Sequence, residues 1–306
     1  MDRCDDTLYV TAPPDEAPPG LKQRLVAKAS ALILPVVKRA ARPYLGGDTI
    51  ADALCVAERV HADGMASTIG YWDRGDENLI AVRQVYLDAI AAMAKGGDYL
   101  SVKPPALRFS GETAAELAAA AAPNGLRIHC DSHGPEVADL SNRMLEAMRK
   151  HLSPELIGTT LPGRWRRSLG DADWAVAAGT NVRVVKGQWP DPEDKGRDPS
   201  AGFLEVVDRL CGRARLVAVA THDFALGSEA IRRLQSAGTA CEVEVLLGYP
   251  AKPLLNWAKA NGVKVRVYVP YGGGFIPNAI GVLKRNPRLI FKVAAAQVDR
   301  LAALFR

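Results

Sequence analysis

Hydrophobic and polar positions along this chain follow two alternating periods, which predict a repeated unit of one strand and one helix. Short and nearly continuous apolar runs are typical of buried parallel strands, and longer segments with apolar residues every three or four positions are typical of covering helices. The apolar runs occupy 66–72, 99–103, 126–131, 156–161, 182–187, 216–221, 241–247 and 265–269. The helical segments lie near 47–63, 78–95, 112–122, 135–151, 168–178, 200–212, 224–237 and 250–261.

Glycines separate several helical segments from the strand that follows. Gly125, Gly179, Gly238 and Gly262 each stand just before an apolar run, where a helix is expected to stop. Eight strands that alternate with helices imply right-handed β-α-β units. The pattern therefore predicts an α/β fold of the (β/α)8 TIM-barrel type. An open, doubly wound sheet is the alternative, although no GxGxxG motif follows the first strand.

The N-terminal part of the chain differs from this repeat. Residues 1–20 are acidic and rich in proline, which predicts a flexible tail, and they contain no apolar core of a signal peptide. Residues 21–45 form a basic, amphipathic segment that Pro35 interrupts. Such a helix either covers one end of the core or lies peripherally on a membrane surface. We expect residues 21–306 to form one barrel domain with this N-terminal helical extension.

Composition narrows the class of protein. The chain has 306 residues, of which 48% are hydrophobic and 24% are charged, as in an ordinary soluble protein. The chain contains no run of 18 apolar residues, so we expect no transmembrane helix. A formal net charge of +5 and only 6% aromatic residues do not favour binding of nucleic acid. The five cysteines are scattered without a CxxC pair, so we expect reduced thiols and a cytoplasmic protein.

The apolar run at 182–187 carries two cations, Arg183 and Lys186, followed by Gly187, Gln188 and Trp189. Unpaired charges are costly to bury, so cations near the end of such a strand indicate a site for an electron-rich group. The alternative is a strand whose cations extend to solvent.

Polar residues also stand at the ends of other predicted strands, where (β/α)8 barrels carry their working residues. Six strands contribute such side chains: Lys103, His129, Asp131, Arg183, Lys186, Thr221, His222, Asp223, Glu242, Glu244, Tyr268 and Tyr271. Because these strand ends meet at one face of a barrel, we expect the side chains to converge there.

Two chemistries compete for this face. The first is a metal site built from side chains of ligand type, His129, Asp131, His133 and His222. Cations crowded at the same face oppose it, because they repel a metal ion. The second is an anionic, electron-accepting cofactor such as a flavin, whose charge the cations stabilise. The turn at 221–223 before a helix suits a phosphate, although His222 would equally fit a structural role.

Several segments resemble the proline dehydrogenase family, a family of flavin-binding (β/α)8 barrels, over residues 40–290. The matching segments are 101–103, 182–187, 220–223, 241–248 and 266–272. Segments 161–167 and 188–192 resemble the short bacterial members of the family.

This resemblance implies FAD as cofactor, oxidation of a carbon–nitrogen bond, and transfer of the electrons to a quinone or another acceptor. It implies that Arg183 lies near flavin N5. The other implied cofactor-binding residues are Lys186, Gly187, Gln188, Trp189, Thr221, His222 and Glu244. Lys103 and Tyr268 would line the substrate side, and His129 or Asp131 would take the amine proton.

The chain departs from the family where the family binds the amino acid carboxylate. The last helix of the family carries Tyr-x-x-Arg-Arg-x-x-Glu, and the matching positions here are Asn278, Gly281, Val282 and Arg285. The acid in the third strand of the family is replaced by His129. We therefore expect Lys103, Tyr268, Asn278 and Arg285 to contact an amine, imino compound or modified amino acid rather than free L-proline. A metal-dependent hydrolase and a non-catalytic barrel are the alternative functions.

Overall fold

The structure is a computed structural model that describes residues 42–93 and 97–274. In this part of the chain eight parallel strands pair in sequence order, and the last pairs with the first, so the sheet closes into a barrel. The strands are β1 (Ala66–Tyr71), β2 (Tyr99–Val102), β3 (Arg127–Cys130), β4 (Ile157–Pro162), β5 (Asn181–Val185), β6 (Val217–Ala220), β7 (Cys241–Leu246) and β8 (Lys264–Tyr271). The predicted (β/α)8 barrel is confirmed, and the doubly wound alternative is wrong.

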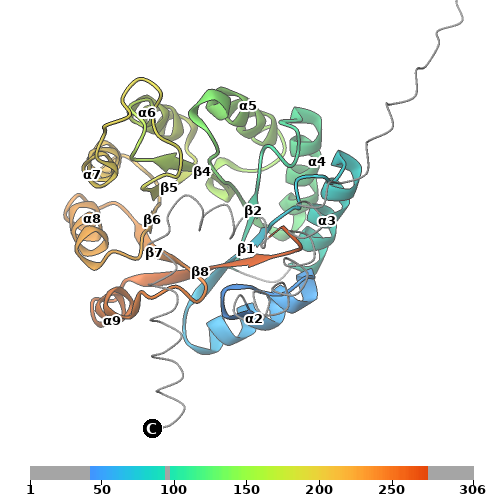
Figure 1. The fold of residues 1–306 in the computed structure, drawn as a ribbon, viewed down its shortest axis with the longest axis horizontal. Coiled ribbons are helices and arrows are strands. Elements are labelled where there is room, and N and C mark those ends of the chain that lie inside the picture. Colours follow the sequence, from blue (N-terminus) through green and yellow to red (C-terminus); the bar gives the residue numbers. More distant parts are fainter. Residues whose placement is uncertain (1–41, 94–96, 275–306) are drawn as a thin grey trace, which may run out of the picture. The chain divides into compact units, whose positions relative to one another are not determined.

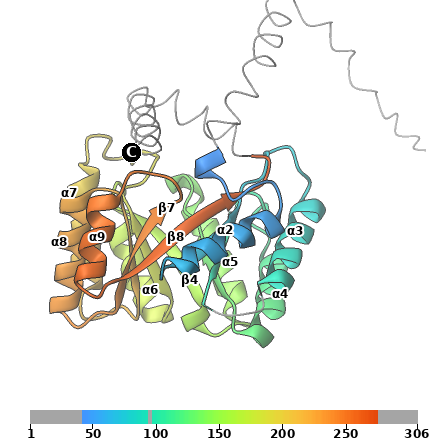
Figure 2. The same ribbon diagram turned by 90° about the horizontal axis from the view of Figure 1, so that it is seen from below.

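Helices surround the strands on the outside, as Figure 1 shows in the view that looks into the barrel. They are α2 (Ile50–Ala62), α3 (Leu79–Ala92), α4 (Gly111–Ala121), α5 (Ala138–Met148), α6 (Ser168–Ala178), α7 (Pro199–Leu210), α8 (Phe224–Ser236) and α9 (Lys252–Ala260). Short 3-10 turns are η1 (Arg42–Tyr44), η2 (Ala122–Asn124), η3 (Pro135–Val137) and η4 (Pro154–Leu156). In the side view of Figure 2, α2 lies against β8.

The helix boundaries follow local capping chemistry. Thr49 accepts a hydrogen bond from the Asp52 amide and the Asp52 carboxylate accepts one from the Thr49 amide, which forms a capping box before α2. Gly179 ends α6 at a φ of 69°, where glycine is free of the strain that a side chain brings. The predicted helix over 135–151 is shorter than expected: it begins as the 3-10 turn η3, and α5 ends at Met148.

The strands alternate between an apolar outer face and a polar inner face. Leu100, Ile128 and Val184 are completely buried and belong to the apolar core. Their chain neighbours Ser101 and Arg183 instead bond to the carboxylate of Asp131, which follows β3. Successive strand residues point to opposite faces, so the inner face carries the polar side chains. The barrel interior is therefore polar where many barrels are filled by branched aliphatic residues.

An ion pair occupies the barrel near the starts of β7 and β8. Arg266 Nε lies 2.8 Å from Glu242 Oε1, and the two side chains are 1% and 2% exposed. Arg266 Nη1 also donates to the Ser67 carbonyl at 2.7 Å, and its guanidinium lies over the Tyr99 ring. These partners satisfy the buried charge of Arg266. Glu242 was predicted to join the polar side chains at the strand ends, but it instead forms a structural ion pair near the start of β7.

The tail predicted over 1–20, and the helix predicted over 21–45 apart from its last residues, lie outside the described residues. Residues 42–44 form η1. In the parts of the chain that the structure describes, every helix is too short or too polar to cross a membrane.

Candidate active site

Most of the predicted site residues gather where the strands end. Lys103 directly follows β2 and Asp131 follows β3. Lys186 comes directly after β5, and Thr221 and His222 come after β6. Arg183, Glu244 and Tyr268 lie inside β5, β7 and β8. Asn278 and Arg285 lie outside the described residues, so their predicted contacts stay predictions.

Arg183 is the central cation of this site. Its Nε and Nη2 donate to the two oxygens of Glu244 at 2.7 and 2.8 Å, and its Nη1 donates to Asp131 Oδ1 at 2.7 Å. Burial lowers the pKa of Arg183, but Glu244 and Asp131 outweigh burial and the net pKa is raised. Glu244 also accepts from the Thr68 hydroxyl at 2.9 Å. Arg183 therefore stays charged although its side chain is only 5% exposed.

Tyr268 crosses from β8 to the end of β3. Its hydroxyl donates to Asp131 Oδ2 at 2.9 Å, and its ring centroid lies 5.4 Å from the Arg183 guanidinium carbon. Gly70 on β1 makes room for it, because a Cβ there would lie 2.1 Å from the Tyr268 oxygen. Burial and the nearby Asp131 raise the pKa of Tyr268, so its hydroxyl stays protonated at neutral pH.

Asp131 joins three strands through its carboxylate. Its Oδ1 accepts from Ser101 at 2.6 Å and from Arg183, and its Oδ2 accepts from Tyr268. A carboxylate has about four lone-pair positions, so three donors leave one position for a further donor. Ser101 was not among the predicted site residues, although its place one residue before the end of β2 is a usable signal.

His129 is buried inside the barrel, with 4% of its surface exposed. The Thr160 hydroxyl donates to the Cys130 carbonyl at 3.0 Å, so the Thr160 oxygen accepts from His129 Nε2 at 2.9 Å. The hydrogen of this imidazole is therefore on Nε2, and the lone pair is on Nδ1. Burial and the nearby Arg183 lower the pKa of His129 well below its usual range, so the ring is neutral.

The Nδ1 atom of His129 faces the backbone of β4. A Cβ on Gly158 would lie 2.1 Å from that atom, so only glycine fits opposite the ring. The structure thus places the one lone pair of His129 against the barrel wall and away from the strand ends.

Lys103 stands at the side of the site formed by β1 and β2. Its Nζ lies 3.8 Å from Asp73 Oδ1 and 4.9 Å from the centroid of the Trp72 ring. Burial lowers the pKa of Lys103, and Asp73 and Asp131 partly offset that effect. The Tyr86 hydroxyl accepts from the Lys103 amide at 3.0 Å and so fixes its backbone. Trp72, Asp73 and Tyr86 were not among the predicted site residues.

His222 stands on the opposite side, at the start of the loop before α8. The Leu246 amide donates to His222 Nε2 at 3.0 Å, so the hydrogen of the ring is on Nδ1. Burial lowers the pKa of His222 to about 4, which keeps it neutral. Its ring stacks on Tyr249 at 5.2 Å between centroids, and Tyr249 contacts Tyr44 edge-on at 5.4 Å. Thr221 beside it is 6% exposed.

The segment after β5 is anchored by its own contacts. Lys186 Nζ lies 3.2 Å from Asp223 Oδ2, and both side chains are partly exposed. Gly187 has a φ of 92°, a backbone conformation that favours glycine. The Trp189 carbonyl accepts from Trp165 Nε1 at 2.9 Å, whereas Gln188 is exposed.

The predicted metal ligands do not converge. In residues 42–93 and 97–274, no group of three or more His, Cys, Asp and Glu side chains is placed to hold a metal ion. Asp131 is bonded to Arg183, His129 to Thr160, and His222 to the Leu246 amide. The His133 ring instead lies 5.7 Å from the Trp189 ring. These contacts give no support to the metal-dependent hydrolase.

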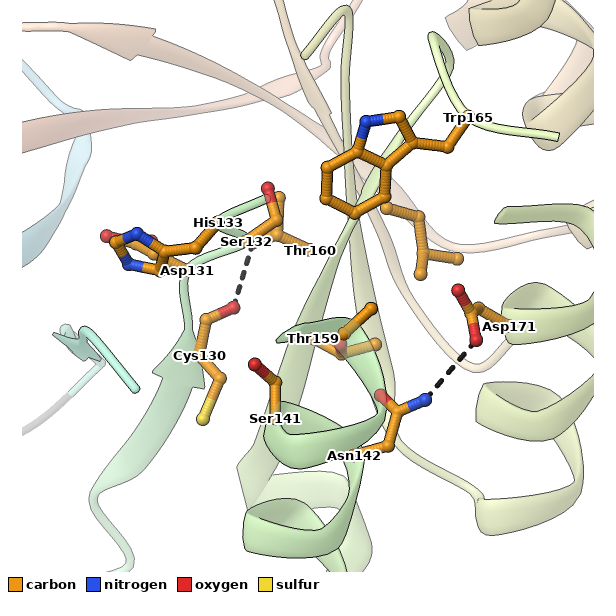
Figure 3. Close-up of a pocket in the computed structure, with 12 residues that line it drawn as sticks. Cys130, Asp131, Ser132, His133, Ser141, Asn142, Thr159, Thr160, Trp165 and Asp171 are labelled. Atoms are coloured by element: carbon orange, nitrogen blue, oxygen red, sulfur yellow. Dashed lines mark hydrogen bonds between the residues drawn. The ribbon is translucent and has the colours of Figure 1, made fainter. Parts of the chain in front are cut away.

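A polar hollow adjoins the site on the side of α5 and α6 (Figure 3). The hollow is open to solvent and has an empty volume of about 350 Å³. Asp131, His133 and Trp165 are among the residues that line it. Asn142 donates to Asp171 at 3.2 Å on its helix side. Burial lowers the pKa of His133 to about 4, and its buried Nε2 has no partner among the described residues. The hollow gives the loop after β3 polar surroundings without defining a ligand.

The ring of eight strands and the polar side chains at its strand ends define a (β/α)8 barrel with a polar site. No protein-family model matches the chain. Two proline dehydrogenases are similar to it in sequence. The protein from Deinococcus radiodurans is 26% identical over 254 residues, which cover 76% of this chain and 81% of that one. Proline dehydrogenase 1 from Bacillus subtilis is 25% identical over 258 residues, which cover 76% and 82%.

Solved structures agree at the level of the fold. Proline utilization A (PutA) from Bdellovibrio bacteriovorus, inactivated by N-propargylglycine, has a TM-score of 0.69 and 19% identity over 87% of this chain. PutA from Bradyrhizobium japonicum has a TM-score of 0.62 and 20% identity over 86% of this chain. The chain covers 34% and 33% of these two proteins, about a third of each. The chain is therefore similar in sequence to two proline dehydrogenases, and it shares the barrel fold of the PutA proteins.

Proposed function

We propose that this protein is a FAD-dependent dehydrogenase that oxidises the carbon–nitrogen bond of a small amine or amino-acid-derived compound. The observation that carries the proposal is the buried, charged Arg183, held by Glu244 and Asp131 in a barrel related to proline dehydrogenases. Such a fixed cation stabilises negative charge that develops on a bound group, without reorganising when the reaction occurs.

The side chains at the strand ends fit a flavin nucleotide. Four of the five N–H groups of Arg183 bond to Glu244, Asp131 and Thr160, and one on Nη2 has no acceptor among the described residues. The Nδ1 hydrogen of His222 likewise has no acceptor in the described part of the chain. Lys186 and Thr221 stand beside them. These donors would hold the cofactor, and the bound flavin would supply the hydride acceptor.

The substrate side would be the part of the site near Lys103 and Tyr268. An amine must lose a proton before its carbon–nitrogen bond is oxidised, and Asp131 and His129 were the two predicted acceptors. Asp131 keeps one lone-pair position beside Tyr268, whereas the lone pair of His129 faces Gly158. We therefore assign the amine proton to Asp131, and we assign His129 a positioning role through Thr160 and the neighbouring Arg183.

The natural substrate is proposed to be a compound other than free L-proline. The support is in the sequence, where Gly281 and Val282 stand at the positions of the carboxylate-binding arginine pair of the family. Neither residue can replace a guanidinium that binds a carboxylate through two hydrogen bonds. A quinone or another electron acceptor would reoxidise the flavin.

A visible spectrum of the purified protein tests this function. We expect the absorption bands of an oxidised flavin, which disappear when a substrate from a panel of amines is added without an acceptor. An artificial dye acceptor should then restore the bands. A protein that contains no flavin and takes up none from added FAD would refute the proposal.

A further inference from the structure

Arg164 lies in the turn that follows β4 and is tied to the end of β5. The Gly163 amide donates to the Val185 carbonyl at 2.8 Å, and the Arg164 amide donates to the Lys186 carbonyl at 3.1 Å. The next residue, Trp165, is 2% exposed and is anchored to the Trp189 carbonyl. The backbone position of Arg164 beside Lys186 is therefore fixed.

The guanidinium of Arg164 has no acidic partner in the described part of the chain, unlike those of its neighbours. Arg166 pairs with Asp194 at 2.9 Å, and Arg167 pairs with Asp139 and Asp171. The Nε of Arg164, in contrast, is buried and has no hydrogen-bond partner among the described residues. Leaving a charged donor buried without an acceptor is costly, so this position indicates an acceptor that a ligand provides.

Two further features make the surroundings of Arg164 suitable for an anion. Lys186 adds a second cation, and its partner Asp223 is itself partly exposed, so that pair is weak. A Cβ atom at position 187 would lie 3.4 Å from the Arg164 Cβ and 2.7 Å from the Pro162 Cβ, so a residue other than glycine would fill this space. The glycine therefore keeps space open between the ends of β4 and β5.

We propose that Arg164 and Lys186 bind an anionic oxygen group, a phosphate or a carboxylate, at the ends of β4 and β5. A guanidinium suits this task because it donates two parallel hydrogen bonds to either group. The ligand has two sources under the proposed function, on which this inference rests: the diphosphate of the cofactor and a carboxylate of the substrate. Arg164 was not among the predicted site residues, although it belongs to segment 161–167, which resembles the short bacterial members of the family.

The test compares full-length wild type with Arg164→Gln and with the matched control Arg166→Gln. Arg166 lies two residues away in the same loop and has an acidic partner of its own. Thermal unfolding with and without inorganic pyrophosphate measures the anion site without any flavin. We expect pyrophosphate to raise the unfolding temperature of the wild type and of Arg166→Gln, and to have little effect on Arg164→Gln. Equal stabilisation of all three proteins would overturn the inference.

Flavin titrations then identify the source of the anion. If it is the diphosphate, Arg164→Gln should bind FAD about tenfold or more weakly, with riboflavin binding unchanged. If it is the substrate carboxylate, FAD binding should stay unchanged. The concentration of a carboxylate-bearing amine that perturbs the flavin spectrum should then be about tenfold or more higher for Arg164→Gln than for the wild type. A variant that matches the wild type in both measurements overturns the inference, whereas a wild type that binds pyrophosphate but no flavin overturns the proposed function alone.

Discussion

At the scale of single residues, the site depends on one buried cation, which pairs with a buried carboxylate and with a partly buried one. Arg183 neutralises Glu244, which is 3% exposed, and shares Asp131 with Tyr268. Removing one partner from such a group leaves the others charged in a medium that solvates them poorly. The same residue is therefore expected to support both the folded state and the binding of the cofactor.

Replacing Arg183 by alanine should destabilise the protein by about 3–5 kcal/mol, because Glu244 and Asp131 then lose their buried counter-ion. It should also lower the ratio of bound flavin to protein. Urea unfolding and the visible spectrum measure the two effects. Arg209→Ala, which removes an exposed pair with Asp173, is the control and should change neither quantity appreciably. Unchanged stability and flavin content in Arg183→Ala would contradict the assignment.

The fit between His129 and Gly158 gives a second prediction at this scale. Gly158→Ala should cost on the order of 1–3 kcal/mol, because the new methyl group would overlap His129 Nδ1. In a His129→Ala background the same substitution should cost much less, since the ring is absent. Gly170→Ala in α6 is the control, because no atom of the described residues lies within 4 Å of its added Cβ. Equal costs of Gly158→Ala in the two backgrounds would show that the ring does not fill this space.

At the scale of elements, the ends of neighbouring strands are tied together by side chains. Asp131 after β3 bonds to residues of β2, β5 and β8. His222 after β6 accepts from the Leu246 amide at the end of β7. The His222 bond satisfies a backbone amide, the Asp131 bonds join side chains, and together they make the loops part of a fixed site.

The bond between His222 and β7 predicts a pH dependence of stability. The folded state holds the pKa of His222 at about 4, below the ordinary value of 6.5 that applies to the unfolded chain. The stabilisation is therefore complete above about pH 6.5 and is lost as the pH falls toward 4, because the unfolded state binds a proton first. Urea unfolding across this range should show a smaller loss for His222→Gln than for the wild type. His133, whose pKa is also about 4, should keep part of the slope in both proteins. Identical slopes in the two proteins would contradict the role of His222.

At the scale of the whole molecule, the flavin-binding part and the substrate-binding part of the family pattern are separable. The residues that we propose for the flavin lie in β5 and directly after it, in β7 and in the loop after β6, all within the described barrel. By the sequence resemblance, the residues that bind the amino acid carboxylate in the family would correspond to positions 278–285, which follow β8 in the sequence. The carboxylate-binding residues can therefore change while the barrel and the proposed flavin-binding residues stay the same.

This separation predicts poor oxidation of free L-proline. Loss of the arginine pair at positions 281 and 282 should lower kcat/KM by about tens- to thousands-fold relative to a typical family member. The quadruple variant Asn278→Tyr, Gly281→Arg, Val282→Arg and Arg285→Glu should raise it. Pyrrolidine, which has no carboxylate, is the control substrate, and the quadruple variant should oxidise it with the same kcat/KM as the wild type. Assays with a dye acceptor measure both rates, and a wild-type efficiency typical of the family would contradict the prediction.

Local sequence patterns were sufficient to predict the architecture. Each strand of a parallel barrel is buried on both faces, so its apolar run stands out, and each helix ends at a signal such as Gly179. Two cations in the run at 182–187 led to the predicted site, and the structure places Arg183 in β5 and Lys186 directly after it. Boundaries were less accurate: the predicted helix over 135–151 extended too far in both directions, because the proline turn before it and the last turn after it are not α-helical.

The sequence by itself thus determined the repeated β-α unit, the end of the barrel that carries polar side chains, and the candidate residues Arg183, Asp131 and Tyr268. Only the tertiary structure decided which atoms meet. It gave Asp131 three donors from three strands and turned the lone pair of His129 toward Gly158. It also left the Nε of Arg164 buried without a partner among residues 42–93 and 97–274. The physical reason is that periodicity is a local property of the chain. Hydrogen-bond partners, burial and pKa depend on residues that are distant in sequence, which barrel closure brings together.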